Sequence, residues 1–155
     1  MVEYSKNKDL ILNLFDDFNL LKKFKVDKGV QKKMLKELLE AGPNPWRVVG
    51  ITVNALSLFK EHGYKKAKSI KIQRAHLVDR DEWYSKLLEH DWDNAFEWYK
   101  FIYENDRTVL ALSFENKRIK KINFINFGGL GVNLFKSTRI SWKHGKAEIE
   151  FLRRL

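Results

Sequence analysis

The chain contains no cysteine, so disulfide bonds and thiolate metal sites are excluded. It has only two prolines, both within the Gly-Pro-Asn-Pro stretch at residues 42–45, which predicts an internal boundary there. No apolar run is long enough to span a bilayer, and the first residues lack the apolar stretch of a secretory signal. We therefore expect a cytoplasmic protein that does not enter a membrane.

Apolar and charged residues are both plentiful among the 155 residues. Hydrophobic residues make up 44% of the chain and aromatic residues 14%, which argues against disorder. We expect a single domain over residues 1–155, with a helical subregion at 1–41 and a mixed core at 46–155. The core should carry a basic C-terminal third.

Positive charge dominates, with 30 Lys and Arg against 20 Asp and Glu, a formal net charge of +10. Residues 106–155 hold eleven of the basic residues and four of the acidic ones. This excess favours an anionic partner, with nucleic acid ahead of an anionic membrane surface. We expect DNA rather than RNA, bound by the basic C-terminal third, and a duplex target would suit a homodimer. A basic face that is merely solvated is the alternative.

Hydrophobic periodicity predicts an α+β fold, in which N-terminal helices pack with a mainly antiparallel sheet and a C-terminal helix closes the chain. Helices are expected at about residues 10–21, 29–41, 52–61, 81–89, 92–104 and 148–152. Strands are expected at 46–51, 69–72, 108–114, 119–127, 132–135 and 139–142.

The segment Gln-Arg-Ala-His-Leu-Val-Asp-Arg at residues 73–80 is the strongest chemical signal. His76 follows a predicted basic strand and has Arg74 and Arg80 close by in the sequence. An imidazole can take a proton near neutral pH, and guanidinium groups bind phosphate oxygens. The pattern indicates phosphodiester chemistry with His76 as general base, although a single histidine at a strand end is also often structural.

Developing phosphate charge needs a cation, which is either an arginine such as Arg74 or Arg80, or a divalent metal such as Mg²⁺. Asp79 and Asp81 are candidate oxygen ligands for that metal, and Asp81 is also a candidate N-cap of the following helix.

Two stretches carry a family resemblance. Ala75-His76-Leu77-Val78 resembles the opening motif of HNH (ββα-metal) nucleases, and residues 105–116 resemble the second motif of that family. The resemblance covers about residues 70–120. It implies that His76 activates water against a phosphodiester, that Asn105 orients the histidine, and that Asn116 holds a divalent metal.

A second basic segment, residues 136–146, crowds hydroxyls, cations and rings together. It suits phosphate binding by charge-assisted hydrogen bonds and base stacking by Trp142. The candidate binding residues are Lys136, Ser137, Arg139, Trp142, Lys143, His144 and Lys146. A basic strand that leads into the last helix is the structural alternative.

These patterns leave three functions open. The first is a metal-dependent DNA endonuclease of the restriction or mobile-element type. The second is a metal-independent ribonuclease, such as a toxin, that uses His76 and His144. The third is a nucleic-acid-binding protein without catalytic activity.

Overall fold

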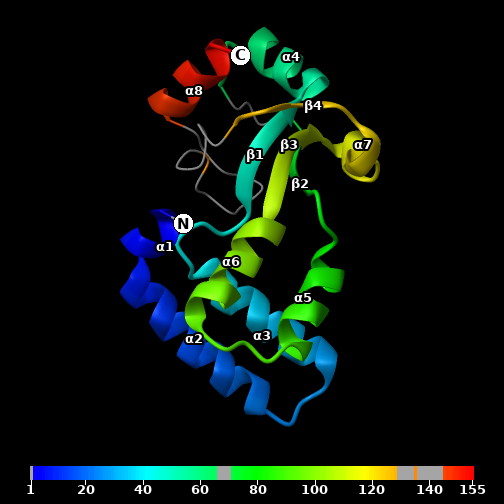
Figure 1. Cartoon of the computed structure of the whole chain (residues 1–155). Coiled ribbons are helices and arrows are strands. Elements are labelled where there is room, and N and C mark those ends of the chain that lie inside the picture. The colour runs from blue at the N-terminus through cyan, green and yellow to red at the C-terminus, as the bar shows by residue number, and fades with distance from the viewer. Residues whose placement is uncertain (1, 66–70, 129–134, 136–144) are drawn as a thin grey trace. The chain divides into compact units, whose positions relative to one another are not determined.

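The computed structural model describes residues 2–65, 71–128, 135 and 145–155 (Figure 1). Helices open and close the chain and a four-stranded sheet lies between them in sequence, so the predicted α+β class is confirmed. The chain divides into two compact units, each built from two stretches of sequence. The helical unit comprises Met1–Pro45 and Val78–Asp106, and the sheet unit comprises Trp46–Leu77 and Arg107–Leu155. The first boundary follows the predicted Gly-Pro-Asn-Pro stretch.

The helical unit consists of α1 (Val2–Lys6), α2 (Lys8–Lys23), α3 (Lys28–Glu40), α5 (Arg80–Glu89) and α6 (Ala95–Asn105). Apolar side chains at helical spacing turn one face of each long helix inward. The core is aromatic: the Trp98 ring lies 5.6 Å from that of Phe15 and 5.4 Å from that of Phe18. Trp83 and Tyr84 are buried in the same core. The aromatic-rich helices therefore supply packing.

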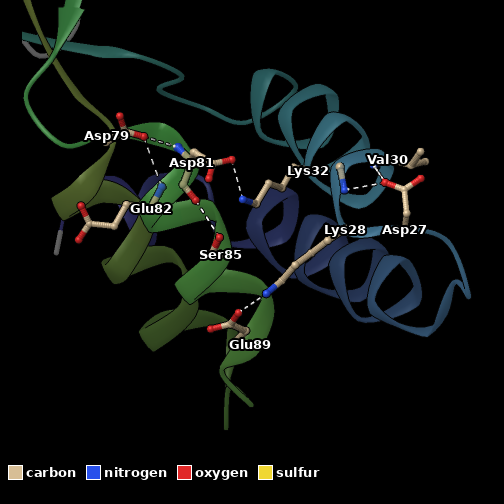
Figure 2. A network of polar contacts seen from close by, with 10 residues as sticks. Asp27, Lys28, Val30, Lys32, Asp79, Asp81, Glu82, Ser85 and Glu89 are labelled. Carbon is tan, nitrogen blue, oxygen red and sulfur yellow. Dashed lines mark hydrogen bonds and ion pairs between the residues drawn. The ribbon is translucent and has the colours of Figure 1, made fainter.

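A side-chain cap begins α3, and two ion pairs join α3 to α5 (Figure 2). Asp27 accepts hydrogen bonds from the N–H groups of Gly29 and Val30 at the start of α3. Lys28 pairs with Glu89, and Lys32 Nζ lies 2.6 Å from Asp81 Oδ1. Asp81, a candidate cap in the sequence analysis, instead contributes to this pairing between helices.

The sheet unit contains β1 (Arg47–Thr52), β2 (Ile72–His76), β3 (Arg107–Leu112) and β4 (Phe124–Asn126) in the order β2-β3-β1-β4. The pairs β2–β3 and β1–β4 are antiparallel, and the central β1–β3 pair is parallel. Residues of α4 (Val53–Glu61) and α8 (Lys146–Arg153) pack with the strands in one core cluster. A smaller apolar cluster includes Ala75, Val109, Ala111 and Ile119.

Gly50 allows β4 to approach β1 closely. A Cβ atom at this position would lie 2.5 Å from Phe124 Cδ2 and 2.6 Å from the Ile125 carbonyl oxygen. Only a residue without a side chain fits such an approach. The pairing register also shifts between Val48 and Gly50, so β1 is irregular at this point.

Two predicted strands are partly wrong. The strand expected at 108–114 ends at Leu112, and α7 (Ser113–Asn116) begins because the Glu115 carboxylate accepts the Leu112 N–H at 2.8 Å. Residues 119–127 form the 3₁₀ helix η1 (Ile119–Lys121) and the short strand β4 rather than one strand. The strands expected at 132–135 and 139–142 lie outside the described residues, apart from Phe135.

Helices 52–61 and 148–152 were predicted close to their observed places, and Thr52 caps α4 by accepting the Ala55 N–H at 3.2 Å. None of the helices in the described residues is long and apolar enough to cross a bilayer.

Candidate functional site

The two units carry opposite charge. Of the basic residues, 18 lie in the sheet unit against four Asp and Glu, a net charge of +14. The helical unit holds 12 basic and 16 acidic residues, a net charge of −4. The excess that the composition revealed therefore belongs to the sheet unit alone. An anionic partner would be attracted there.

His76 is the last residue of β2 and pairs with Thr108 of β3. Its side chain is half-buried, and its ring meets the Trp46 ring edge to face, with ring centroids 5.4 Å apart. The imidazole therefore packs against an aromatic ring and keeps part of its surface in contact with solvent. This is the placement that a general base needs.

Trp46 lies just before β1 in a left-handed backbone conformation, with φ +52°. Such a conformation is unfavourable for a bulky residue and persists only when neighbouring groups hold it. The Trp46 carbonyl oxygen accepts a hydrogen bond from Thr108 Oγ1 at 3.0 Å and another from Arg74 Nη1 at 3.2 Å. These two hydrogen bonds hold the backbone of Trp46, the residue whose ring lies beside His76.

Arg74 is buried, with 9% of its surface exposed. Its second terminal nitrogen, Nη2, donates to the carbonyl oxygen of Phe135, which also has a left-handed backbone, with φ +56°. The guanidinium group therefore binds two main-chain carbonyls of the sheet unit. The phosphate-binding role predicted for Arg74 stays a prediction beside this structural one.

The two asparagines implied by the family resemblance lie in different units. Asn105 ends α6 in the helical unit, where its side-chain amide donates to the Phe101 carbonyl of the same helix at 2.8 Å. Asn116 ends α7 in the sheet unit and donates to Gln73 Oε1 at 3.0 Å. Because side chains alternate along a strand, Gln73 and His76 point to opposite faces of β2. Asn116 and His76 are therefore not brought together.

Asp79 and Arg80 lie in the helical unit at the start of α5. Asp79 Oδ1 accepts the N–H groups of Asp81 at 2.8 Å and Glu82 at 3.4 Å, so Asp79 is the N-cap of this helix (Figure 2). The capping role that the sequence offered to Asp81 belongs to Asp79. The predicted roles of Asp79 in metal binding and of Arg80 in phosphate binding stay predictions.

The residues predicted to bind a divalent metal belong to different units, Asp79 to the helical unit and Asn116 to the sheet unit. Within the described ranges, the structure forms no group of three or more His, Cys, Asp or Glu side chains that could hold a metal ion. The side-chain carbonyl oxygen of Asn116 is a possible metal ligand. Ala75, which lies on the same face of β2 as Gln73, has no side-chain oxygen that could be a second ligand. The metal-binding roles of Asn116 and Asp79 stay predictions.

Most of the second predicted constellation falls in residues 136–144, outside the described residues. This applies to Lys136, Ser137, Arg139, Trp142, Lys143 and His144. Lys146 is described: it is exposed at the start of α8, and its Nζ lies 3.8 Å from Glu150 Oε1.

Sequence reasoning missed the organising role of Glu115, which is 2% exposed. Its carboxylate accepts Thr52 Oγ1 at 2.6 Å, Asn54 Nδ2 at 2.9 Å and the Leu112 N–H at 2.8 Å. These bonds tie α7 to the end of β1 and the start of α4. A glutamate in the third position of a helix is a recognised N-terminal signal, and it was available in the sequence.

Comparison of the chain with protein-family models, with curated proteins and with solved structures gives no match.

Proposed function

We propose that the protein cleaves phosphodiester bonds of nucleic acid and that His76 is its general base. The observation that carries this proposal is a half-buried imidazole, packed against an aromatic ring, at a strand end within a unit of net charge +14. The charge supplies the attraction for a polyanion, and the imidazole supplies proton transfer. The resemblance of residues 75–78 to the opening HNH motif points to the same chemistry.

The order of elements also supports the proposal. The strands β2 and β3 form an antiparallel pair, and the four-residue helix α7 follows β3 directly, so within the sheet unit these three elements follow one another as strand, strand, helix. The insertion of α5 and α6 between the two strands does not interrupt the pairing. The strands run in register from Ile72 opposite Leu112 to His76 opposite Thr108. This is the ββα order that the family resemblance leads us to expect.

In the proposed reaction, His76 accepts a proton from a water molecule while the water oxygen forms a bond to phosphorus. The bond from phosphorus to the leaving sugar oxygen breaks, and that oxygen takes up a proton from solvent. Trp46 holds the imidazole ring in place, and Arg74 acts as a positioning residue because it fixes the Trp46 carbonyl. The cation that meets the developing charge is a basic side chain of the sheet unit or a divalent metal supplied with the substrate.

The test is a cleavage assay on plasmid DNA and on RNA, with and without Mg²⁺ and EDTA. His76→Ala should lower the cleavage rate about 100- to 10,000-fold, the usual contribution of a general base. The matched control is His62→Ala, because His62 is an exposed histidine of the same unit whose ring nitrogen lies 3.0 Å from the Leu58 carbonyl. This control should cleave like the parent protein.

The arms of the assay separate the alternatives. DNA cleavage that EDTA abolishes would support the metal-dependent endonuclease, and RNA cleavage that survives EDTA would support the ribonuclease. Salt-dependent binding without cleavage of either polymer would overturn the proposal in favour of a binding protein. Equal activity of His76→Ala and the parent would also overturn it, provided that circular dichroism shows both to be folded.

A further inference from the structure

A basic groove in the sheet unit lies apart from the predicted site residues. It has a volume of about 1140 Å³ and is lined by α7, by the segment that follows it and by the residue before β2. Four cations line it: Lys71, Lys117, Arg118 and Lys121. All four are exposed. In the described part of the chain, none of them pairs with a carboxylate.

Phe114 lines the same groove and is 70% exposed, more than any other large hydrophobic residue among those described. A single exposed apolar residue needs no explanation by itself. The position of Phe114 needs an explanation, because its ring lies in a groove that is also lined by four cations. An exposed ring next to several positive charges is the combination that binds bases by stacking and phosphates by attraction.

Hydrogen bonds anchor the short helix α7 on both sides of Phe114. On one side of Phe114, Ser113 Oγ accepts the Gln73 amide at 3.2 Å. On the other side, the Glu115 carboxylate is buried and accepts three hydrogen bonds, and Asn116 donates to Gln73 at 3.0 Å. The residues that flank Phe114 are therefore anchored while its ring is left in solvent. Such an arrangement reduces the entropy lost when a partner binds.

We infer that this groove binds single-stranded nucleic acid, with Phe114 stacking on a base and Lys71, Lys117, Arg118 and Lys121 following the phosphates. A single strand is favoured over a duplex because the bases of a duplex are already stacked and cannot cover the ring. The inference rests on the proposed function, because it names the form of nucleic acid that the same unit would receive. The groove lies at the Ile72 end of β2, whereas His76 is the last residue of that strand, so the groove would bind a part of the strand away from the imidazole.

The experiment measures binding of a fluorescent oligonucleotide of about 12 nucleotides by anisotropy, in EDTA and with the His76→Ala protein so that cleavage does not interfere. Phe114→Ala should weaken binding about tenfold, since stacking on one base is worth about 1–3 kcal/mol. The matched control is Phe24→Ala. Phe24 is a 53% exposed phenylalanine of the helical unit, and its removal should leave affinity unchanged.

Substitutions that remove positive charge test whether the cations of the groove bind phosphates. Replacing Lys117, Arg118 and Lys121 by Gln should weaken binding and reduce the slope of log affinity against log salt by about 0.7 for each phosphate that the variant no longer binds. The matched control changes the same charge in the helical unit, with Lys23, Lys25 and Lys33 replaced by Gln, all of which are exposed. The control should keep most of the affinity and the salt slope of the parent.

Several results would overturn the inference. One is unchanged affinity of Phe114→Ala, and another is equal loss of affinity in the groove and control variants. Tighter binding of a DNA duplex with no effect of Phe114 would assign the groove to double helices. Binding of anionic lipid vesicles with the same dependence on Phe114 would assign it to membranes.

The inference and the proposed function can fail separately. Loss of binding in the groove variants without any cleavage by the parent would end the nuclease proposal and keep the groove. Cleavage by the parent, together with unchanged oligonucleotide binding by Phe114→Ala, would keep the nuclease proposal and end the inference about the groove. DNA and RNA oligonucleotides of the same length show which sugar the groove prefers.

Discussion

The two units use their charged residues differently. In the helical unit, lysines pair with carboxylates of other helices or of the loops between them: Lys22 Nζ lies 2.7 Å from Asp91, Lys32 Nζ lies 2.6 Å from Asp81, and Lys28 pairs with Glu89. In the sheet unit, Lys146 alone among the described lysines pairs with a carboxylate, four residues along its own helix. These three lysines of the helical unit therefore join segments that are distant in sequence, whereas the described lysines of the sheet unit form no such long-range pair.

The hydrophobic cores of the two units also differ. The helical unit buries a continuous aromatic cluster with two fully buried tryptophans, Trp83 and Trp98. The sheet unit divides its apolar residues between two smaller clusters. It also buries polar groups that hold loops in place, among them Arg74 and Glu115. The helical unit therefore has one large aromatic core, whereas the sheet unit combines smaller apolar clusters with buried polar side chains.

The largest effect should come from Trp98→Ala. Trp98 is 1% exposed and packs against Phe15 and Phe18, so its removal leaves a large cavity and should cost about 3–5 kcal/mol of unfolding free energy. Urea unfolding measures the cost, and amide hydrogen exchange shows where it falls. Increased exchange in the helical unit with little change in β1 and β3 would confirm that the units differ in stability. Uniform acceleration would show that they unfold together.

A smaller effect is expected from Gly50→Ala in the sheet unit. The added methyl group would meet the Phe124 ring and the Ile125 carbonyl, and overpacking of this kind costs about 1–3 kcal/mol. The control is Gly63→Ala, where a Cβ would meet no atom within 4 Å, although its φ of +62° adds some strain. If Gly50→Ala has the same melting temperature as the parent, β4 does not approach β1 closely enough to exclude a side chain at residue 50.

The smallest expected effect concerns the stability of the protein at low pH. The hydrogen bond and charge of Lys28 lower the pKa of Glu89 below its ordinary value of 4.5, and Lys22 lowers the pKa of Asp91 below 3.8 in the same way. A lowered folded pKa stabilises the protein above the ordinary pKa, and this stabilisation disappears as the pH falls through the folded pKa. The double variant Lys22→Gln/Lys28→Gln should have a slightly lower urea midpoint than the parent near neutral pH. The two midpoints should converge once the pH has fallen below the folded pKa of both carboxyl groups. A difference that persists in acid would mean that the lysines act through packing.

The elements that the sequence predicted well are those with strong local signals. Periodic apolar residues located α2 and α3, and Thr52 was recognised as the cap of α4. The segment after Leu112 was predicted wrongly because its apolar residues resemble a strand, whereas Glu115 binds groups from β1 and α4 that are distant in sequence. Such long-range hydrogen bonds leave no periodic pattern.

The candidate site was only partly predictable for a related reason. His76 was located at a strand end by its sequence context, and it lies there. The contact of its ring with Trp46 joins residues that are remote in sequence, and the two carbonyls bound by Arg74 are equally remote from it. The division of charge between the units was also hidden, because each unit is assembled from two separate stretches of chain.

The segment Val78–Asp106 leaves the sheet unit after Leu77 and returns at Arg107. The Leu77 N–H donates to the Arg107 carbonyl oxygen at 3.0 Å, so the chain departs and returns at neighbouring points. In effect, α5 and α6 are the loop of a very large hairpin. A hairpin loop can be exchanged without moving its stem. A short turn in place of this segment should therefore leave β2 and β3 in register. With residues 1–45 also removed, because their helices share a core with α5 and α6, the product would be a miniature of the basic unit for study.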